Sequence, residues 1–283
     1  MVTVGDIYTN SKAIFKANGI ESYRFEAACI IESLFKTRIN VLINSEIIVG
    51  ESQVNIIQEM LKKRLQGYPL QYILGEWEFY SLPFKVGEGV LIPRQDTETL
   101  VDYVLEFAKD KPNPKIADLC SGSGCIAIAI DKNLLNAQIN AVEVSEKAVS
   151  FLKQNVELNS SAVQIVLGDV LDTGVVENFN ELDIIVSNPP YLTNENLKNL
   201  QKEVSFEPEM ALYGGDEGMS FYKGITQKWS KALKKGGLLA FEIGIGQEDC
   251  VTEILKQNGF KNINYRCDLN QIIRVVAAIK GDA

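Results

Sequence analysis

The strongest chemical signature in the chain is the motif Asn188-Pro189-Pro190-Tyr191, which directly follows an apolar run at residues 183–187. Its two prolines lack backbone N–H groups and stiffen the chain. The polar groups that remain are acceptors, the Asn188 side-chain oxygen and the Pro189 carbonyl, and Tyr191 adds a flat aromatic face. Two acceptors beside an aromatic wall suit a planar –NH2 group, whose nitrogen could then attack an electrophilic methyl group without a general base. The structural alternative is a Pro-Pro turn with Tyr191 as packing.

A second candidate site is the glycine-containing turn at residues 118–124, Asp-Leu-Cys-Ser-Gly-Ser-Gly. It ends an expected strand and opens an expected helix, where backbone N–H groups are free to bind a ligand. Gly122, Gly124 and Ala127 also satisfy the dinucleotide pattern G-x-G-x-x-G/A, with Glu143 about 20 residues further on. The residues alone therefore fit an adenosyl cofactor and a nicotinamide cofactor, and a tight turn without a ligand is the structural alternative.

Two carboxylates follow the next two expected strands. Glu143 ends the second strand, where it can accept hydrogen bonds from both hydroxyls of a ribose, and Asp169 ends the third, where an adenine edge could lie. Taken alone, each acid is equally well explained as a helix cap or turn residue. Ligands of open α/β sheets bind outside the carboxyl ends of the strands. The glycine turn and the two acids together therefore predict one cofactor site.

Histidine is absent from all 283 residues, which excludes a Ser-His-Asp triad, a Cys-His pair and a His-ligated metal site. We expect no metal. The 28 basic and 37 acidic residues give a net charge of -9, so bulk charge attracts neither nucleic acid nor anionic lipid, and we expect no direct nucleic-acid partner and no membrane. Cysteines without a CxxC pair, in a chain without a secretory leader, predict a reducing compartment, the cytoplasm.

The elements that must position these residues alternate between strand and helix patterns from residue 115 onward. Strands are expected at residues 116–120, 139–144, 163–167, 183–187 and 238–243, and helices at residues 125–133, 146–159, 217–234 and 248–258. Two last strands, 263–267 and 271–279, are joined by a turn too short for a helical crossover and should pair antiparallel. The pattern predicts an α/β fold with a doubly wound, mainly parallel, seven-stranded sheet.

The N-terminal part of the chain has helical patterns instead. Helices are expected at residues 22–35, with Ser22 as cap, and at residues 52–66, and a β-hairpin is expected within residues 77–90. A further helix is expected at residues 97–109. We therefore predict a helical N-terminal domain at residues 1–75, a hairpin linker at residues 76–95 and the sheet domain at residues 96–283.

These motifs in this order resemble the class I S-adenosylmethionine-dependent methyltransferases. Within that class the chain is similar to the protein-glutamine N5-methyltransferases of peptide chain release factors, the PrmC/HemK family. The matching segments cover nearly the whole chain, at residues 69–75, 91–98, 118–124, 186–191, 206–208 and 242–244. The Ile-Pro-Arg and Asn-Pro-Pro-Tyr motifs in this order, after a helical domain, are highly specific for the family. Asn-Pro-Pro-Tyr alone is shared with DNA amino-methyltransferases.

The resemblance implies methyl transfer from S-adenosylmethionine, which leaves as S-adenosylhomocysteine, to the glutamine of the Gly-Gly-Gln motif of release factors, docked by the N-terminal domain. Glu143 would hold the ribose, and Val170, after Asp169, would line the adenine pocket. Asn188 would touch both cofactor and substrate. The methionine part of the cofactor would be wrapped by Cys120, Ser121, Gly122, Ser123 and Gly124, and the glutamine side chain would be gripped by Asn188, Pro189, Pro190 and Tyr191.

The chain departs from the family pattern at four positions. Cys120 stands where glycine is usual, Glu143 where aspartate is usual, Val170 where some members have tryptophan and Gln95 where proline is usual. Arg94 and Glu98, within the Ile-Pro-Arg segment, are expected to form a structural ion pair.

Four other functions remain as alternatives. A ribosomal-protein glutamine methyltransferase shares the same chemistry, and a DNA amino-methyltransferase would place a flipped base against Tyr191. A nicotinamide oxidoreductase would use the glycine turn but offers no role for residues 188–191. The last alternative is a binding module without catalysis.

Overall fold

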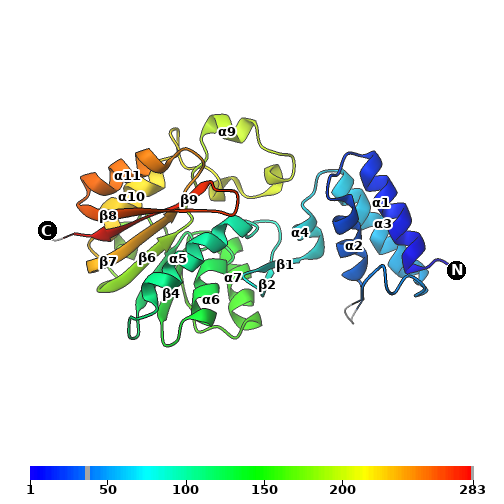
Figure 1. Ribbon diagram of the computed structural model, residues 1–283, viewed down its shortest axis with the longest axis horizontal. Coiled ribbons are helices and arrows are strands. Elements are labelled where there is room, and N and C mark those ends of the chain that lie inside the picture. The colour runs from blue at the N-terminus through cyan, green and yellow to red at the C-terminus, as the bar shows by residue number, and fades with distance from the viewer. Residues whose placement is uncertain (36–38, 282–283) are drawn as a thin grey trace. The chain divides into compact units, whose positions relative to one another are not determined.

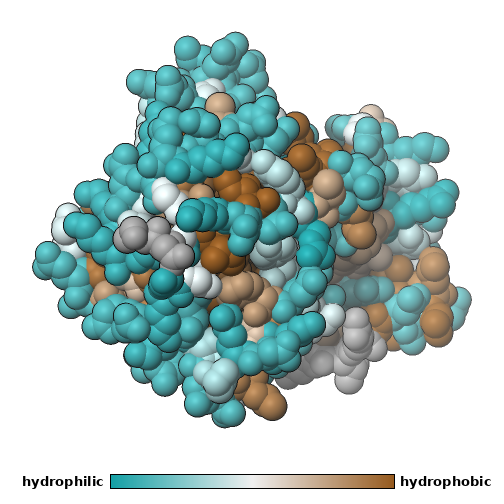
Figure 2. Space-filling model, turned by 60° about the vertical axis from the view of Figure 1, so that its left-hand side comes forward, coloured by the Kyte–Doolittle hydropathy of each residue, from teal (hydrophilic) through white to brown (hydrophobic). Residues whose placement is uncertain are grey.

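The computed structural model describes residues 1–35 and 39–281, which form two compact units. The first unit contains Met1–Glu76 together with the distant segment Gln201–Phe206, and the second contains Trp77–Leu200 and Glu207–Ala283 (Figure 1). In the part of the chain that the structure describes, no helix is long and apolar enough to cross a membrane. Hydrophilic side chains cover most of the face shown in Figure 2, and apolar side chains reach the surface in a few separate areas.

The first unit is built from helices α1 (Val4–Ala17), α2 (Tyr23–Glu32), α3 (Glu51–Leu65) and the short α4 (Leu70–Leu74). Helix α1 begins with a capping box, in which Thr3 Oγ1 accepts from the Asp6 amide at 3.2 Å and the Asp6 carboxylate accepts from the Thr3 amide at 3.0 Å. Apolar side chains at helical spacing form the buried core of the unit; they include Val4, Ile7, Phe15, Ala27, Ile30, Ile31, Ile57 and Leu61.

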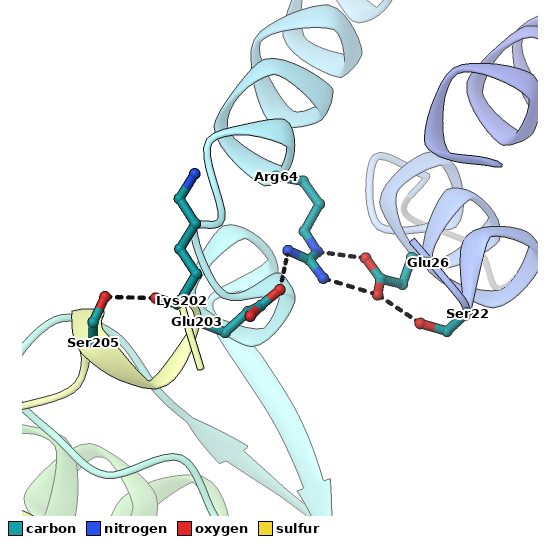
Figure 3. Close-up of polar contacts among 6 residues, drawn as sticks. All are labelled: Ser22, Glu26, Arg64, Lys202, Glu203 and Ser205. Atoms are coloured by element: carbon teal, nitrogen blue, oxygen red, sulfur yellow. Dashed lines mark hydrogen bonds and ion pairs between the residues drawn. The ribbon is translucent and has the colours of Figure 1, made fainter. Parts of the chain in front are cut away.

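A buried arginine holds the segment Gln201–Phe206 in the first unit (Figure 3). Arg64, on α3, donates through Nε to Glu26 at 2.5 Å and through another guanidinium nitrogen to Glu203 at 2.9 Å. The Phe206 ring packs edge-on against Tyr68, with ring centroids 5.2 Å apart. No sequence pattern pointed to this pairing, because 139 residues separate Arg64 from Glu203.

A seven-stranded sheet forms the centre of the second unit. Its strands are β3 (Lys115–Leu119), β4 (Gln138–Glu143), β5 (Gln164–Leu167), β6 (Leu182–Ser187), β7 (Leu233–Glu242), β8 (Phe260–Cys267) and β9 (Ile273–Lys280), in the order β5-β4-β3-β6-β7-β9-β8. Strands β3 to β7 pair parallel, and β9 pairs antiparallel with both β7 and β8. The predicted doubly wound, mainly parallel sheet is therefore confirmed, together with the antiparallel pair at the end of the chain.

Helices cover both faces of this sheet (Figure 1). One face packs on α5 (Glu98–Ala108), α6 (Cys125–Asn133) and α7 (Glu146–Leu158), and the other on α8 (Thr173–Val176), α10 (Ser220–Trp229) and α11 (Glu248–Gln257). Strand side chains alternate between the two cores, so Ile116 faces the first and Ala117 the second. A separate two-stranded hairpin, β1 (Glu76–Phe79) with β2 (Leu82–Lys85), precedes the sheet.

Two local expectations differ from the structure, and one segment holds additional elements. The Ser22 hydroxyl makes no cap hydrogen bond and instead donates to Glu26 at 2.7 Å. Helix α10 ends at Trp229 rather than at residue 234, because β7 already begins at Leu233. The segment between β6 and α10 also holds elements that were not expected, the short helices α9 (Asn194–Lys198), η2 (Val204–Phe206) and η3 (Glu209–Ala211).

Candidate active site

A cavity of about 730 Å³ in the second unit lies at the carboxyl ends of β3, β4, β5 and β6. This volume falls in the range of roughly 300–1,000 Å³ that is usual for ligand sites. The cavity brings together residues from all four strand ends, as expected for a doubly wound sheet. Of the residues predicted from the sequence, its walls include Cys120, Ser121, Gly122, Ser123, Glu143, Asp169, Val170, Asn188 and Pro190.

Positive φ angles shape the glycine turn after β3. Gly122 has φ 55° and Gly124 has φ 81°. A Cβ atom at Gly122 would meet nothing within 4 Å, whereas one at Gly124 would lie 2.1 Å from Leu152 Cδ1. Gly122 therefore leaves open space beside a cavity wall, and Gly124, which is not part of that wall, allows α6 to begin tightly against α7.

Cys120 adopts the same left-handed backbone conformation as these glycines, with φ 60°. This conformation costs an L-residue with a side chain roughly 1–2 kcal/mol. Burial, and then the charge of Glu143, raise the pKa of the Cys120 thiol well above its ordinary value. The thiol therefore stays protonated, and the position carries backbone strain without a reactive thiolate.

Glu143, the last residue of β4, ties the glycine turn to the neighbouring strand. Its Oε2 accepts from the Gly122 amide and its Oε1 from the Ser145 amide, each at 2.8 Å. Each carboxylate oxygen retains a further acceptor site. Because Glu143 also lines the cavity, the same carboxylate can shape the turn and meet a ligand hydroxyl.

Asp118 lies directly beneath the glycine turn, and its role was not recognised in the sequence. Its side chain is fully buried, and Oδ2 accepts from the Ala127 amide at 3.2 Å. Burial raises the pKa of Asp118 to about 8, although this hydrogen bond opposes the shift. The carboxyl therefore supports the start of α6 largely in its neutral form at neutral pH. The sequence signal that could have indicated this role is an acidic residue, Asp118, within an otherwise apolar strand pattern.

The end of β5 forms a third part of the wall. Asp169 accepts from the Leu171 amide at 2.8 Å, which closes a turn, and Val170 is buried beside the cavity. The Val170 carbonyl accepts from Trp229 Nε1 at 2.8 Å, so α10 fixes this wall.

Strand register brings the motif at residues 188–191 next to the glycine turn. Leu119 of β3 pairs with Ser187 of β6, and the Ser187 hydroxyl donates to the Leu119 carbonyl at 2.6 Å. Asn188 therefore enters the cavity wall directly beside Cys120. The Asn188 amide donates from Nδ2 to Thr97 Oγ1 at 3.4 Å, a long hydrogen bond.

Pro189 and Tyr191 are outside the set of described residues that line the cavity. The Tyr191 ring packs against the core formed with α10 and α11, and its carbonyl accepts from Gln247 Nε2 at 3.1 Å. Burial, and then the charge of Glu242, raise the pKa of Tyr191 to about 12. Tyr191 thus holds the corner from behind in this conformation.

The expected ion pair between Arg94 and Glu98 is wrong. Arg94 pairs with Glu207, whose side chain is 1% exposed, while Glu98 accepts from the Tyr80 amide at 2.7 Å. Glu207 also accepts from the Ile92 amide at 3.0 Å. The two residues were paired because they share one motif, but the acceptor of Arg94 is 113 residues distant in the sequence. Glu207 thereby fixes the wall at residues 92–94.

Across residues 1–35 and 39–281, no group of three or more acidic or cysteine side chains is placed so that it could hold a metal ion.

A mainly parallel sheet of this order, with a glycine turn after β3 and an Asn-Pro-Pro-Tyr corner after β6, defines a class I methyltransferase, a class that uses S-adenosylmethionine. Two family models agree, the methyltransferase small domain at residues 96–207 and the PrmC N-terminal domain at residues 6–75. The catalytic domain of hMettl16, solved with an RNA hairpin, shares the fold at 17% identity, with a TM-score of 0.58 over 82% of this chain and 83% of that one.

Curated relatives define the family more narrowly. Over 97% of its length the chain is 38% identical to the release factor glutamine methyltransferase of Fusobacterium nucleatum, of which it covers 78%. It is 35% identical to the enzyme of that name from Clostridium acetobutylicum, over 98% of this chain and 99% of that protein. The chain belongs to the release factor glutamine methyltransferase family.

Proposed function

We propose that the protein transfers a methyl group from S-adenosylmethionine to the side-chain nitrogen N5 of the glutamine in the Gly-Gly-Gln motif of peptide chain release factors. The observation that carries this proposal is that one cavity joins the glycine turn at Gly122 to Asn188. The relatives given above are named release factor glutamine methyltransferases, so we propose the same protein substrate for this chain. The reaction would be a protein methylation that acts on translation termination.

The residues of the cavity fit this cofactor. Gly122 leaves open space where a side chain would stand, and Glu143 and Val170 lie on adjoining parts of the wall. We assign the ribose to Glu143 and the adenine to Asp169 and Val170. When bound, S-adenosylmethionine supplies an electrophilic methyl group and leaves as S-adenosylhomocysteine. The methionine part is assigned to the turn formed by Cys120, Ser121, Gly122, Ser123 and Gly124.

The corner at residues 188–191 would orient the glutamine. The Asn188 Oδ1, which lines the cavity, can accept one N–H of a carboxamide. We assign the other N–H to the Pro189 carbonyl, although Pro189 does not line the cavity in this conformation. Neither Pro189 nor Pro190 offers a competing backbone donor. Two fixed acceptors set the plane of the amide and increase electron density on its nitrogen. No side chain has to remove a proton first, because the nitrogen carries a surplus proton only after it has gained the methyl group. We assign to Tyr191 the support of this corner.

The first unit is proposed to dock the rest of the release factor. It exposes large apolar side chains, with Leu42, Ile43 and Ile48 at 70%, 82% and 57% exposure. Apolar surface of this kind is typical of protein interaction sites. In this proposal residues 1–75 are the docking domain, residues 76–95 the hairpin linker and residues 96–283 the catalytic domain.

The competing substrates fit less well. A net charge of -9 opposes direct binding of duplex DNA, and it gives no attraction to an anionic membrane. The five cysteines are free, which supports a reducing compartment such as the cytoplasm. A ribosomal-protein glutamine remains the nearest alternative, since the corner would hold it in the same way.

The test is to incubate the full chain with S-adenosylmethionine and intact release factor, then locate the added mass by fragmentation. We expect one methyl group on the Gly-Gly-Gln glutamine and none on a release factor with that glutamine changed to glutamate. Parallel reactions contain ribosomal proteins and duplex DNA. Methylation of either of those in place of the release factor, with cofactor bound, would overturn the proposal.

A further inference from the structure

Glu242, the last residue of β7, is a buried acid to which the proposed chemistry gives no role. It is 3% exposed, and its Oε2 has no hydrogen-bond partner among the described residues. A buried carboxylate oxygen without a partner is costly, so its presence calls for an explanation. Its backbone carbonyl does have one, the Tyr222 hydroxyl at 3.0 Å.

Sheet register places Glu242 beside Asn188. Ser187 of β6 pairs with Phe241 of β7, and the two strands are parallel, so Asn188 and Glu242 are the next residues at the same sheet edge. The Thr97 hydroxyl and the Asn188 amide both lie close enough to the Glu242 carboxyl to lower its pKa as hydrogen-bond donors. Asn188 Nδ2 also donates to Thr97 Oγ1. Three separate segments therefore converge behind one cavity-lining amide.

This convergence has a consequence for the orientation of the amide. An asparagine side chain has one acceptor oxygen and one donor nitrogen of nearly equal size, and its partners decide which way round it stands. Behind Asn188 the partners are the Thr97 hydroxyl and the Glu242 carboxyl, and both favour an orientation in which Nδ2 faces them. The Oδ1 acceptor is then left for the cavity.

We propose that Glu242, with Thr97, is a positioning residue that keeps Asn188 Oδ1 turned toward the carboxamide of the substrate. The proposal rests on the glutamine methyltransferase function proposed above. An ionised Glu242 accepts from Nδ2 and holds the productive orientation. A protonated Glu242 can donate to Oδ1, which favours the flipped amide. The flipped Asn188 then presents its Nδ2 donor to the N–H groups of the substrate carboxamide, which need an acceptor.

The electrostatic surroundings agree with a group that changes charge near neutrality. Burial raises the pKa of Glu242 to about 7, while the hydrogen bond from Thr97 and the charge of Arg274 oppose the shift. The other charged and titratable groups that interact with it are Asp96 on η1 (Gln95–Thr97), Tyr191 after β6, Tyr222 on α10 and Cys125 on α6. The pKa values of Tyr191 and Cys125 are raised to about 12 and that of Tyr222 lies well above 10, so these three do not titrate near pH 7.

The experiment compares full-length wild type with Glu242→Gln, Glu242→Leu and Thr97→Val. The kcat for release-factor methylation is measured from about pH 5.5 to 8.5 at saturating S-adenosylmethionine, and cofactor affinity is measured by calorimetry. Saturation matters because Asp118, beneath the cofactor turn, has a pKa of about 8 and would act through cofactor binding. The matched control is Thr226→Val. Thr226 lies on α10, outside the cavity, and like Glu242 it is buried with a side-chain oxygen that has no partner among the described residues.

We expect wild-type kcat to rise about tenfold as pH increases through about 7, and this rise to be absent in Glu242→Gln. Glu242→Leu should lower kcat roughly 10- to 100-fold and Thr97→Val about threefold, with cofactor affinity within about twofold of wild type. Thr226→Val should leave both unchanged. A rise that persists in Glu242→Gln, or a Glu242→Leu protein that is folded and fully active, would overturn the inference while leaving the proposed function intact. A wild-type protein that binds cofactor and methylates no glutamine would overturn both.

Discussion

The two walls of the cavity are built by different means. The wall formed by the glycine turn is shaped by backbone, since Cys120, Gly122 and Gly124 all have positive φ and Glu143 accepts from backbone amides. The adjoining wall is shaped by side chains, because Asn188 is hydrogen-bonded to Thr97 and Glu242 lies behind it. Substitutions on the first wall should therefore act through conformation and stability, and those on the second through the orientation of one amide.

Asn188→Ala tests the side-chain-shaped wall most directly, and we expect it to have the largest effect on activity. It removes the proposed acceptor for the substrate amide, and loss of one such group lowers kcat by about 10²- to 10³-fold in other enzymes. Stability should change little, because the side chain makes only a 3.4 Å hydrogen bond to Thr97 Oγ1 and contacts with the Glu242 carboxyl. Single-turnover methylation at saturating cofactor measures activity, and urea unfolding measures stability. Asn199→Ala, an exposed amide outside the cavity, is the control and should match wild type.

Gly124→Ala should have the largest effect on the backbone-shaped wall. A Cβ there would lie 2.1 Å from Leu152 Cδ1 at φ 81°, so strain and overpacking add to about 3 kcal/mol of destabilisation. Gly259→Ala is matched in φ, 82°, but a Cβ there meets nothing within 4 Å, so about 1 kcal/mol is expected. Urea unfolding of both variants separates the steric contribution from the conformational one. Equal losses would show that the turn is not tightly packed.

The pH dependence of stability tests the contribution of Asp118, which lies beneath the backbone-shaped wall. Its pKa is raised from 3.8 to about 8 by burial, so the folded state binds a proton that the unfolded state has released between these values. Stability should therefore fall as pH rises from about 4 to about 8, because Asp118 loses its proton in the unfolded chain over this range and keeps it in the folded one. Asp118→Asn keeps an acceptor for the Ala127 amide and removes the titration. The urea midpoint of this variant should fall less steeply with pH than that of wild type, and parallel curves would contradict the assignment.

The sequence predicted the backbone-shaped wall more completely than the side-chain-shaped one. Glycine spacing and an apolar strand are local signals, so the turn at Gly122 and the strand end at Glu143 could both be placed from the sequence. Glu242 and Glu207 act across 54 and 113 residues, on Asn188 and Arg94 respectively, and such pairings come from sheet register and tertiary packing. The error over Arg94 has this origin, because within the motif Glu98 was the nearer acidic partner.

The smallest predicted effect is also the most specific test of the strained turn. Cys120 has φ 60°, where a residue with a Cβ is disfavoured by roughly 1–2 kcal/mol and glycine is not. Cys120→Gly should therefore be more stable than Cys120→Ala by about 1 kcal/mol in urea unfolding, since both variants lose the thiol. Cys29, on helix α2, provides the matched control with the opposite sign. There the glycine variant should be the less stable by about 1 kcal/mol, because glycine is a poor helix former. If the glycine variant were less stable at both positions, the strain at Cys120 would be refuted and the difference between the two walls would lose its basis in backbone conformation.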